Sequence, residues 1–147
     1  MIRSVAVLFS MVVLAGAAAI AADAPAPTVV APSQIHWVPG TGPLQGTQVA
    51  NLFGDPTKQG AFVTRVHMRD GTTLAPHSHP VDENVTVLQG TLMIGLGDKV
   101  DMAKVTALPA GSFFSVPANV HHYAISKGDT IIQLNDIGPW SMDPVKM

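Results

Sequence analysis

The stretch from Gly71 to Gly90 reads GTTLAPHSHPVDENVTVLQG, and its spacing of histidine and carboxylate side chains is the most informative feature of the chain. His77 and His79 are two residues apart, so on an extended segment both imidazoles leave the same face. Glu83 follows after a short turn that contains a proline, close enough for its carboxylate to join the two rings. Two imidazoles and a carboxylate on one face are a typical ligand set for a divalent metal ion. Glu83 is the only glutamate of the sequence, which argues against a generic charged surface.

A second informative stretch runs from Leu108 to Tyr123 and reads LPAGSFFSVPANVHHY. It predicts a strand that leads into a turn ending at Asn119, a residue type that tolerates a left-handed backbone. A histidine opens the next strand. Because His121 and His122 are adjacent, only one of them can face the interior of a sheet structure.

Together the two stretches resemble the two sequence motifs of the cupin family. The first stretch has the pattern G-x5-H-x-H-x3-E-x6-G at every fixed position. The second is similar to G-x5-P-x-G-x2-H-x3-N through Gly111, Pro117 and His122. It departs from that pattern at Asn119, where the family has glycine, and at Ser126, where the family often has asparagine.

The resemblance implies an all-β fold, a single antiparallel jelly-roll β-barrel of about six to eight strands. It also implies that His77, His79, Glu83 and His122 point inward as the ligands of one metal ion. The family register selects His122 over His121, and strand alternation would then place His121 and Tyr123 outward or at the rim.

The rest of the sequence agrees with an all-β fold, because short apolar segments alternate with glycine and proline turns. The expected strands are Ile35–Val38, Gln48–Phe53, Phe62–Met68, Val85–Leu88, Thr91–Leu96, Phe113–Val116, His122–Ser126 and Thr130–Leu134. Helical character is expected only around residues 99–104. Such a pattern favours an antiparallel barrel or sandwich.

Composition excludes several classes of function. The 147 residues include 8 Lys and Arg against 10 Asp and Glu, a mildly acidic balance without charge runs. This balance argues against binding to nucleic acid or to an anionic membrane surface. The chain has no cysteine, so disulfides, thiolate metal sites and cysteine nucleophiles are excluded, and a metal must be held by nitrogen and oxygen.

The N-terminal segment predicts export. Residues 1–22 have a basic residue, an apolar run and a small-residue end, as in a secretory signal peptide. Residues 23–33 are expected to form a flexible tail rich in proline and alanine, and residues 34–147 the barrel domain. The expected location is the periplasm or the exterior, with no stable membrane insertion after cleavage. An uncleaved N-terminal membrane anchor is the alternative.

Few residues besides the ligands are candidates for catalysis. Tyr123, His121, Arg65 and Gln133 are the candidates, with His67 as a further acid–base group. The apolar face of strand Phe62–Met68 should point inward, which would leave Arg65 outside, although in some cupins a polar residue of this strand reaches the ligand. Trp140 is expected to cover one end of the barrel.

The expected cofactor is one divalent metal ion, with zinc, manganese, iron, copper and nickel as candidates. The leading hypothesis for function is a small metal-dependent enzyme that oxidises, oxygenates or isomerises a small oxygen-rich organic molecule. The alternatives are a non-catalytic module that binds or senses a small ligand, and a barrel in which the metal is structural. A homodimer is expected as well, since an open barrel has strand edges to cover.

Overall fold

The computed structural model describes residues 26–146. The elements in chain order are η1 (Pro32–Gln34), β1 (Val38–Pro39), η2 (Gly42–Leu44), β2 (Gln48–Phe53), β3 (Gly60–Met68), β4 (Thr73–Ser78), β5 (Glu83–Leu96), η3 (Met102–Lys104), β6 (Thr106–Pro109), β7 (Phe113–Val116), β8 (His122–Gly138) and β9 (Asp143–Pro144). The predicted signal peptide lies outside the described residues. Within residues 26–146, no helix is both long enough and apolar enough to cross a membrane.

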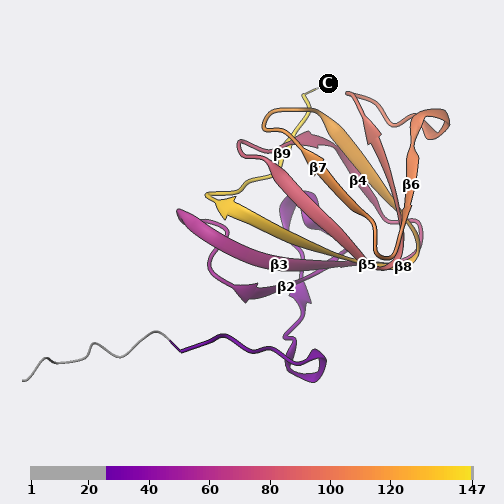
Figure 1. The fold of residues 1–147 in the computed structure, drawn as a ribbon. Coiled ribbons are helices and arrows are strands. Elements are labelled where there is room, and N and C mark those ends of the chain that lie inside the picture. Colours follow the sequence, from indigo (N-terminus) through magenta and orange to yellow (C-terminus); the bar gives the residue numbers. More distant parts are fainter. Residues whose placement is uncertain (1–25, 147) are drawn as a thin grey trace, which may run out of the picture.

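Two long strands, β5 and β8, form the frame of the molecule (Figure 1). The first half of β5 pairs with β7 and its second half pairs with β6. Likewise, the first part of β8 pairs with β4 and its last part with β3, and β5 and β8 pair with each other. Every pair is antiparallel, and the sheet curls on itself into the jelly-roll barrel that the sequence predicts (Figure 1).

Both long strands bend where the sequence predicts turns. The pairing of β5 with β8 shifts register near Gly90, which has a positive φ of 72°, and Gly128 has a φ of 75°. A Cβ at Gly90 would lie 2.5 Å from the carbonyl oxygen of Asp129, so glycine permits the close approach of the two strands. The four separate strands expected at 85–96 and 122–134 are therefore two continuous, bent strands.

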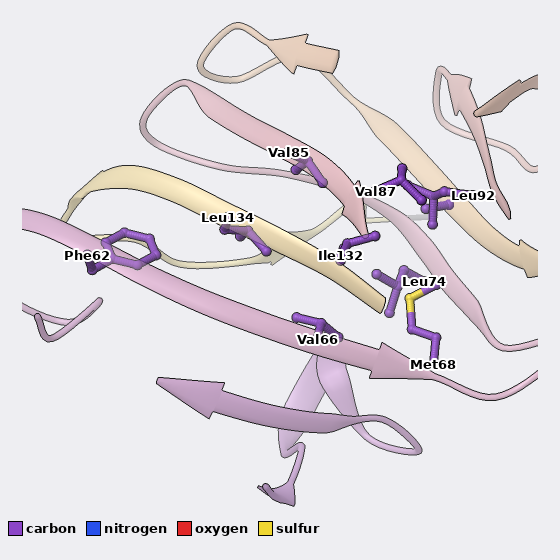
Figure 2. Packing of buried hydrophobic residues seen from close by; sticks show 10 residues of the cluster. Phe62, Val66, Met68, Leu74, Val85, Val87, Leu92, Ile132 and Leu134 are labelled. Carbon is purple, nitrogen blue, oxygen red and sulfur yellow. The ribbon is translucent and has the colours of Figure 1, made fainter. Parts of the chain in front are cut away.

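The core lies between the two halves of the curled sheet and follows strand alternation. Figure 2 shows side chains from β3, β4, β5 and β8 meeting in this space. The buried cluster consists of Phe62, Val66, Met68, Leu74, Val85, Val87, Leu92, Ala124, Ile132 and Leu134. The prediction that the apolar face of β3 points inward is thus confirmed.

The sequence patterns were less informative at the edges. The expected strand Ile35–Val38 is wrong, since only Val38 and Pro39 pair with β2. A 3₁₀ turn precedes them, and Pro39 has no N–H with which to extend a ladder. Strands β4, β6 and β9 are not among the expected strands; proline lies within β4 and is the last residue of β6 and of β9. The expected helical piece is the short η3 turn.

Candidate metal centre

Three histidines and a glutamate meet at one end of the barrel. His77 comes from the end of β4 and pairs in register with His122 at the start of β8. Glu83 begins β5, and His79 lies in the turn between β4 and β5. The four side chains are almost completely enclosed, with exposed fractions of 2 to 7%.

The ring nitrogens of these histidines converge. His77, His79 and His122 each offer a nitrogen, and these atoms lie within 4.8 Å of one another, so the cluster could hold a metal ion. The carboxylate of Glu83 adjoins it, with Oε1 3.4 Å from His79 Nε2 and Oε2 3.2 Å from His122 Nε2. The fold thus brings together all four residues that are expected from the sequence as ligands.

Backbone carbonyls fix which nitrogen of each ring carries a hydrogen. Nδ1 of His77 lies 2.6 Å from the carbonyl oxygen of Ala75, and Nδ1 of His122 lies 3.0 Å from that of Val120. Nδ1 of His79 lies 2.6 Å from the carbonyl oxygen of Ser141. A carbonyl can only accept, so each Nδ1–H donates and, in the neutral ring, each Nε2 lone pair points into the cluster. Metal-binding histidines in proteins are held by the same kind of hydrogen bond behind the ring.

One contact shows that the cluster fits a cation. His79 Nε2 is buried without a hydrogen-bond partner, and its nearest charged neighbour is a carboxylate oxygen of Glu83. With the hydrogen on Nδ1, two lone pairs face each other at 3.4 Å, which is unfavourable unless a proton or a metal ion lies between them. Since burial lowers the pKa of His79, the proton is disfavoured.

The C-terminal segment closes this end of the barrel, as expected for Trp140. The Trp140 indole stacks on the His79 ring with centroids 4.7 Å apart and an interplanar angle of 22°. Strand β9 pairs with β4 at His77 and Ser78. Together with the Ser141 carbonyl, these contacts hold the His79 ring in position.

The electrostatics divide the histidines into two kinds. Burial lowers the pKa of His77 to about 4, so this ring is neutral at pH 7. Burial alone would lower the pKa of His122. The hydrogen bonds to Glu83 and to the Val120 carbonyl outweigh burial and raise this pKa. Burial would raise the pKa of Glu83, but its hydrogen bond to His122 and the neighbouring histidines lower it. The hydrogen bond to Glu83 thus favours the protonated form of His122, and a metal ion would compete with that proton.

The metal-free chain should lose stability when the pH falls from about 6.5 to 4. The folded state disfavours the proton on His77, so the unfolded state binds more protons in this window and acid favours unfolding. The contribution of His77 is about 3 kcal/mol, since each pKa unit corresponds to about 1.4 kcal/mol. Urea unfolding in the presence of a chelator at pH 7 and pH 4.5 measures it.

The His77→Gln variant is the control for this pH dependence. Glutamine does not titrate, so the variant should lose clearly less stability over the same interval. An equal loss in the wild-type chain and in His77→Gln would contradict the assignment of the effect to His77.

The structure places the catalytic candidates away from the cluster. Tyr123 lies on the opposite face of β8 from His122, yet it is completely buried rather than at the rim. Its hydroxyl donates to the Asp101 carbonyl and accepts from the Asp101 N–H, both at 2.9 Å. The loop between β5 and β6 thus covers this face, and Tyr123 has a structural environment.

The other three candidates lie outside the barrel. His121 is exposed and its Nδ1 lies 2.6 Å from Asp98 Oδ1. Arg65 and Gln133 pair in register on the outer face of β3 and β8, where Arg65 Nε donates to Gln133 Oε1 at 2.9 Å. His67 shares this face and contacts Gln48. The inward position considered for Arg65 is therefore wrong.

Sequence reasoning missed one polar residue of this end of the barrel. Asp136 is 4% exposed and continues the inward face of β8 beyond Leu134. Its Oδ1 accepts from the backbone N–H of Asn84 at 2.7 Å and from the Asn84 side chain at 3.0 Å. The alternation Ile132, Leu134, Asp136 indicates the inward position of Asp136 if the expected strand continues past residue 134.

A cavity of about 430 Å³ lies beside the cluster, between β6, β7 and the second half of β5. Two of its lining residues adjoin the cluster, since Val116 pairs in register with Glu83 and Leu96 with His122. Most of its lining side chains are apolar; the polar ones are Lys104, Thr106 and Ser115.

A family model for the cupin domain matches residues 64–138, a span that contains all four residues of the cluster. The chain belongs to the cupin family. The family assignment that the two motifs predicted is thus confirmed.

A plant protein is among the relatives of this cupin. The chain is 33% identical over 88 residues to germin-like protein 5-1 of Oryza sativa subsp. japonica, an alignment that covers 59% of this chain and 39% of the rice protein. The chain thus spans well under half of that relative.

Solved structures show the same fold at low identity. The polyketide cyclase RemF from Streptomyces resistomycificus superposes with a TM-score of 0.66 at 15% identity, over 83% of this chain and 87% of that one. KdgF from Halomonas sp. gives a TM-score of 0.59 at 19% identity, over 77% and 96%. An RmlC-like cupin from Shewanella frigidimarina gives 0.59 at 20% identity, over 78% and 94%.

Proposed function

We propose that this cupin is a metal-dependent enzyme that acts on a small oxygen-bearing organic molecule. The observation that carries the proposal is the set of three His Nε2 lone pairs, each directed by a backbone carbonyl bound at Nδ1, that converge beside a buried carboxylate. His77, His79, His122 and Glu83 would hold the ion. A divalent ion with these ligands supplies a Lewis acid or an oxygen-binding centre for oxidation, oxygenation or isomerisation.

The protein supplies a partly open, mostly apolar pocket beside the site for this chemistry. The 430 Å³ cavity lies on one side of the four ligand side chains, where Val116 and Leu96 adjoin the cluster. Apolar walls lower the local dielectric constant and so strengthen electrostatic interactions beside them. Thr106 offers a hydroxyl group that can orient the oxygens of a bound molecule.

We also propose that the chain is exported and binds metal outside the cytoplasm. The support is the sequence of residues 1–22, with its apolar run and small-residue end. In that compartment the affinity order of a nitrogen and oxygen site favours copper and zinc over manganese and iron. A homodimer is proposed on the ground that β6 and β7 end the curled sheet as edge strands.

A non-catalytic ligand-binding module is the second candidate, and one observation favours it. Tyr123, His121, Arg65 and Gln133 all lie away from the cluster, which leaves few acid–base groups for catalysis. The polyketide cyclase among the similar structures is an enzyme by its name, and this supports the catalytic candidate only by analogy of fold.

Reaction assays of matched metal-loaded and metal-free chain test the proposed function. Small hydroxy acids, sugars and phenols would be incubated with chain loaded with zinc, copper, manganese, iron or nickel, while oxygen uptake and product formation are followed. We expect turnover with at least one metal and none after chelation. The matched control is His77→Ala, which should be inactive while its circular dichroism stays that of the wild-type chain.

Two results would speak against catalysis. Ligand-induced thermal stabilisation without turnover under any metal would identify a binding module. Loss of the folded state upon chelation, with neither turnover nor ligand binding, would identify a structural metal.

A further inference from the structure

A cavity of about 460 Å³ lies on the outside of the barrel. One wall comes from the loop that joins β1 to β2, and the other comes from the end of β3 and the residue that follows it. The polar residues that line it include Gln45, Gln48, His67 and Arg69. It shares no lining residue with the 430 Å³ cavity and none with the histidine cluster. This outer cavity is therefore separate from the metal centre.

The charge of the outer cavity is positive. Strand alternation places His67 and Arg69 on the same outer face, and no aspartate or glutamate lines the cavity. Arg69 forms no ion pair within residues 26–146. The adjacent carboxylate, that of Asp70, is engaged elsewhere, because its Oδ1 accepts from the backbone N–H of Gly128 at 2.6 Å. In a chain with a formal net charge of −2 at pH 7, the outer cavity thus holds a cation that no acidic side chain neutralises.

Side-chain hydrogen-bond donors are in excess in the outer cavity. Oε1 of Gln48 lies 3.2 Å from Nδ1 of His67, and because an amide oxygen only accepts, the hydrogen is on Nδ1. The Gln48 amide therefore keeps both of its N–H groups for another partner. In the part of the chain that the structure describes, the side chains of Gln45 and Arg69 make no hydrogen bond at all. Such a site suits a ligand group that only accepts hydrogen bonds and is negatively charged.

Both walls of the outer cavity are held in place. In the loop wall, the Gly40 N–H donates to the Thr47 carbonyl at 3.0 Å, and the Thr47 N–H donates to the Leu44 carbonyl at 3.1 Å. A Cβ at Gly40 would lie 2.3 Å from that Leu44 oxygen, so the loop closes this tightly only around glycine. In the other wall, the Trp37 ring meets the His67 ring edge-on with centroids 5.8 Å apart. A preformed cavity spares a ligand part of the cost of ordering its site.

We propose that the outer cavity binds a small oxyanion, the carboxylate or phosphate group of a soluble molecule, through Arg69 and the amides of Gln45 and Gln48. A guanidinium group presents two parallel N–H groups, which match two oxygens of a carboxylate or a phosphate. A neutral hydroxyl compound would leave the arginine charge without a counter-charge. The inference goes beyond the proposed function, because this site needs no metal ion and lies on the other side of the sheet.

Inorganic phosphate and acetate are the probes, and the ¹H–¹⁵N signals of the His67 ring report their binding. The sequence has 6 histidines, so the His67→Gln variant identifies these signals. Titrations use the full chain with and without zinc at a constant ionic strength of about 0.15 M, with chloride as the reference anion. We expect saturable shifts with a dissociation constant of about 1 mM for the better probe, and none with chloride. Tighter binding of phosphate identifies phosphate compounds as the ligand class, and tighter binding of acetate identifies carboxylates.

Variants at two arginines of the same face separate a specific contact from a general effect of charge. Arg69→Gln should weaken binding about tenfold, because a hydrogen bond to a charged group is lost. Arg69→Lys keeps the charge without the fork and should lose only about threefold. Arg65→Gln is the matched control: Arg65 donates to Gln133 and does not line the outer cavity. It lies about 13 Å along the strand from Arg69, beyond the screening length of about 8 Å, so its removal should change binding by less than about twofold.

Three results would overturn the inference. The first is the absence of saturable His67 shifts with both probes, or equal shifts with chloride. The second is an equal loss of binding in Arg65→Gln and Arg69→Gln, which would show a diffuse effect of surface charge. The third is wild-type affinity in Arg69→Gln. Zinc affinity should be the same in Arg69→Gln and in the wild-type chain, so a failure of the proposed metal site is recognised independently.

Discussion

His122→Ala is expected to lower the affinity of the chain for zinc by at least about 100-fold, because loss of a partner behind a ligand already costs about 10- to 100-fold. His122 contributes one of three converging nitrogens, and its Nε2 lies 3.2 Å from Glu83. Its removal leaves that carboxylate without its side-chain hydrogen-bond partner in the metal-free state. Competition titration with a chromophoric chelator measures the affinity, and circular dichroism checks that the variant is folded.

The neighbouring histidine provides a matched control. His121 is exposed and contacts Asp98 on the other face of the strand, so His121→Ala should leave zinc affinity within about twofold of the wild-type value. If the two variants lose zinc affinity equally, or if His121→Ala loses more, then the register that selects His122 is wrong.

Gly95→Ala is expected to destabilise the chain by about 3 kcal/mol, at the upper end of the range for overpacked sites. A Cβ at Gly95 would lie 2.2 Å from Tyr123 Cζ and 2.3 Å from its hydroxyl oxygen. The ring cannot move away easily, because Tyr123 is completely buried and its hydroxyl binds both backbone groups of Asp101. Urea unfolding of the wild-type chain and the variant measures the difference.

A double-mutant cycle isolates the steric cause. In a Tyr123→Leu background the ring is absent, so adding Gly95→Ala should destabilise by less than about 1 kcal/mol. An undiminished penalty in that background would show that the backbone of β5, and not the tyrosine ring, requires glycine at this position.

Local sequence information was sufficient to predict three of the four residues of the cluster. His77 and His79 share a face because strand side chains alternate, and Glu83 follows within a few residues, so a short segment places these three. The placement of His122 needed the register of a second motif, which a neighbouring Asn119 with a φ of 64° supports by forming the turn before the strand.

The remainder depends on contacts between residues distant in sequence. The burial of Tyr123 results from a loop more than 20 positions away in the chain, which no periodicity could show. Asp136 is polar in an apolar alternation, and its partner Asn84 is 52 positions away. The sequences at Gly90 and Gly128 resemble hairpin turns. Because β5 and β8 pair with each other on both sides of these bends, each strand continues through its bend.

The contact between His79 and Ser141 also sets an order of events during biosynthesis. The carbonyl that orients this ring lies 62 residues further along the chain. A ribosome releases His77 and His79 well before Ser141 is made, so a nascent chain carries these side chains without the group that directs His79. The hydrogen bond that orients His79 therefore forms only after the C-terminal segment has left the ribosome, so the four side chains reach their final arrangement late in the synthesis of the chain.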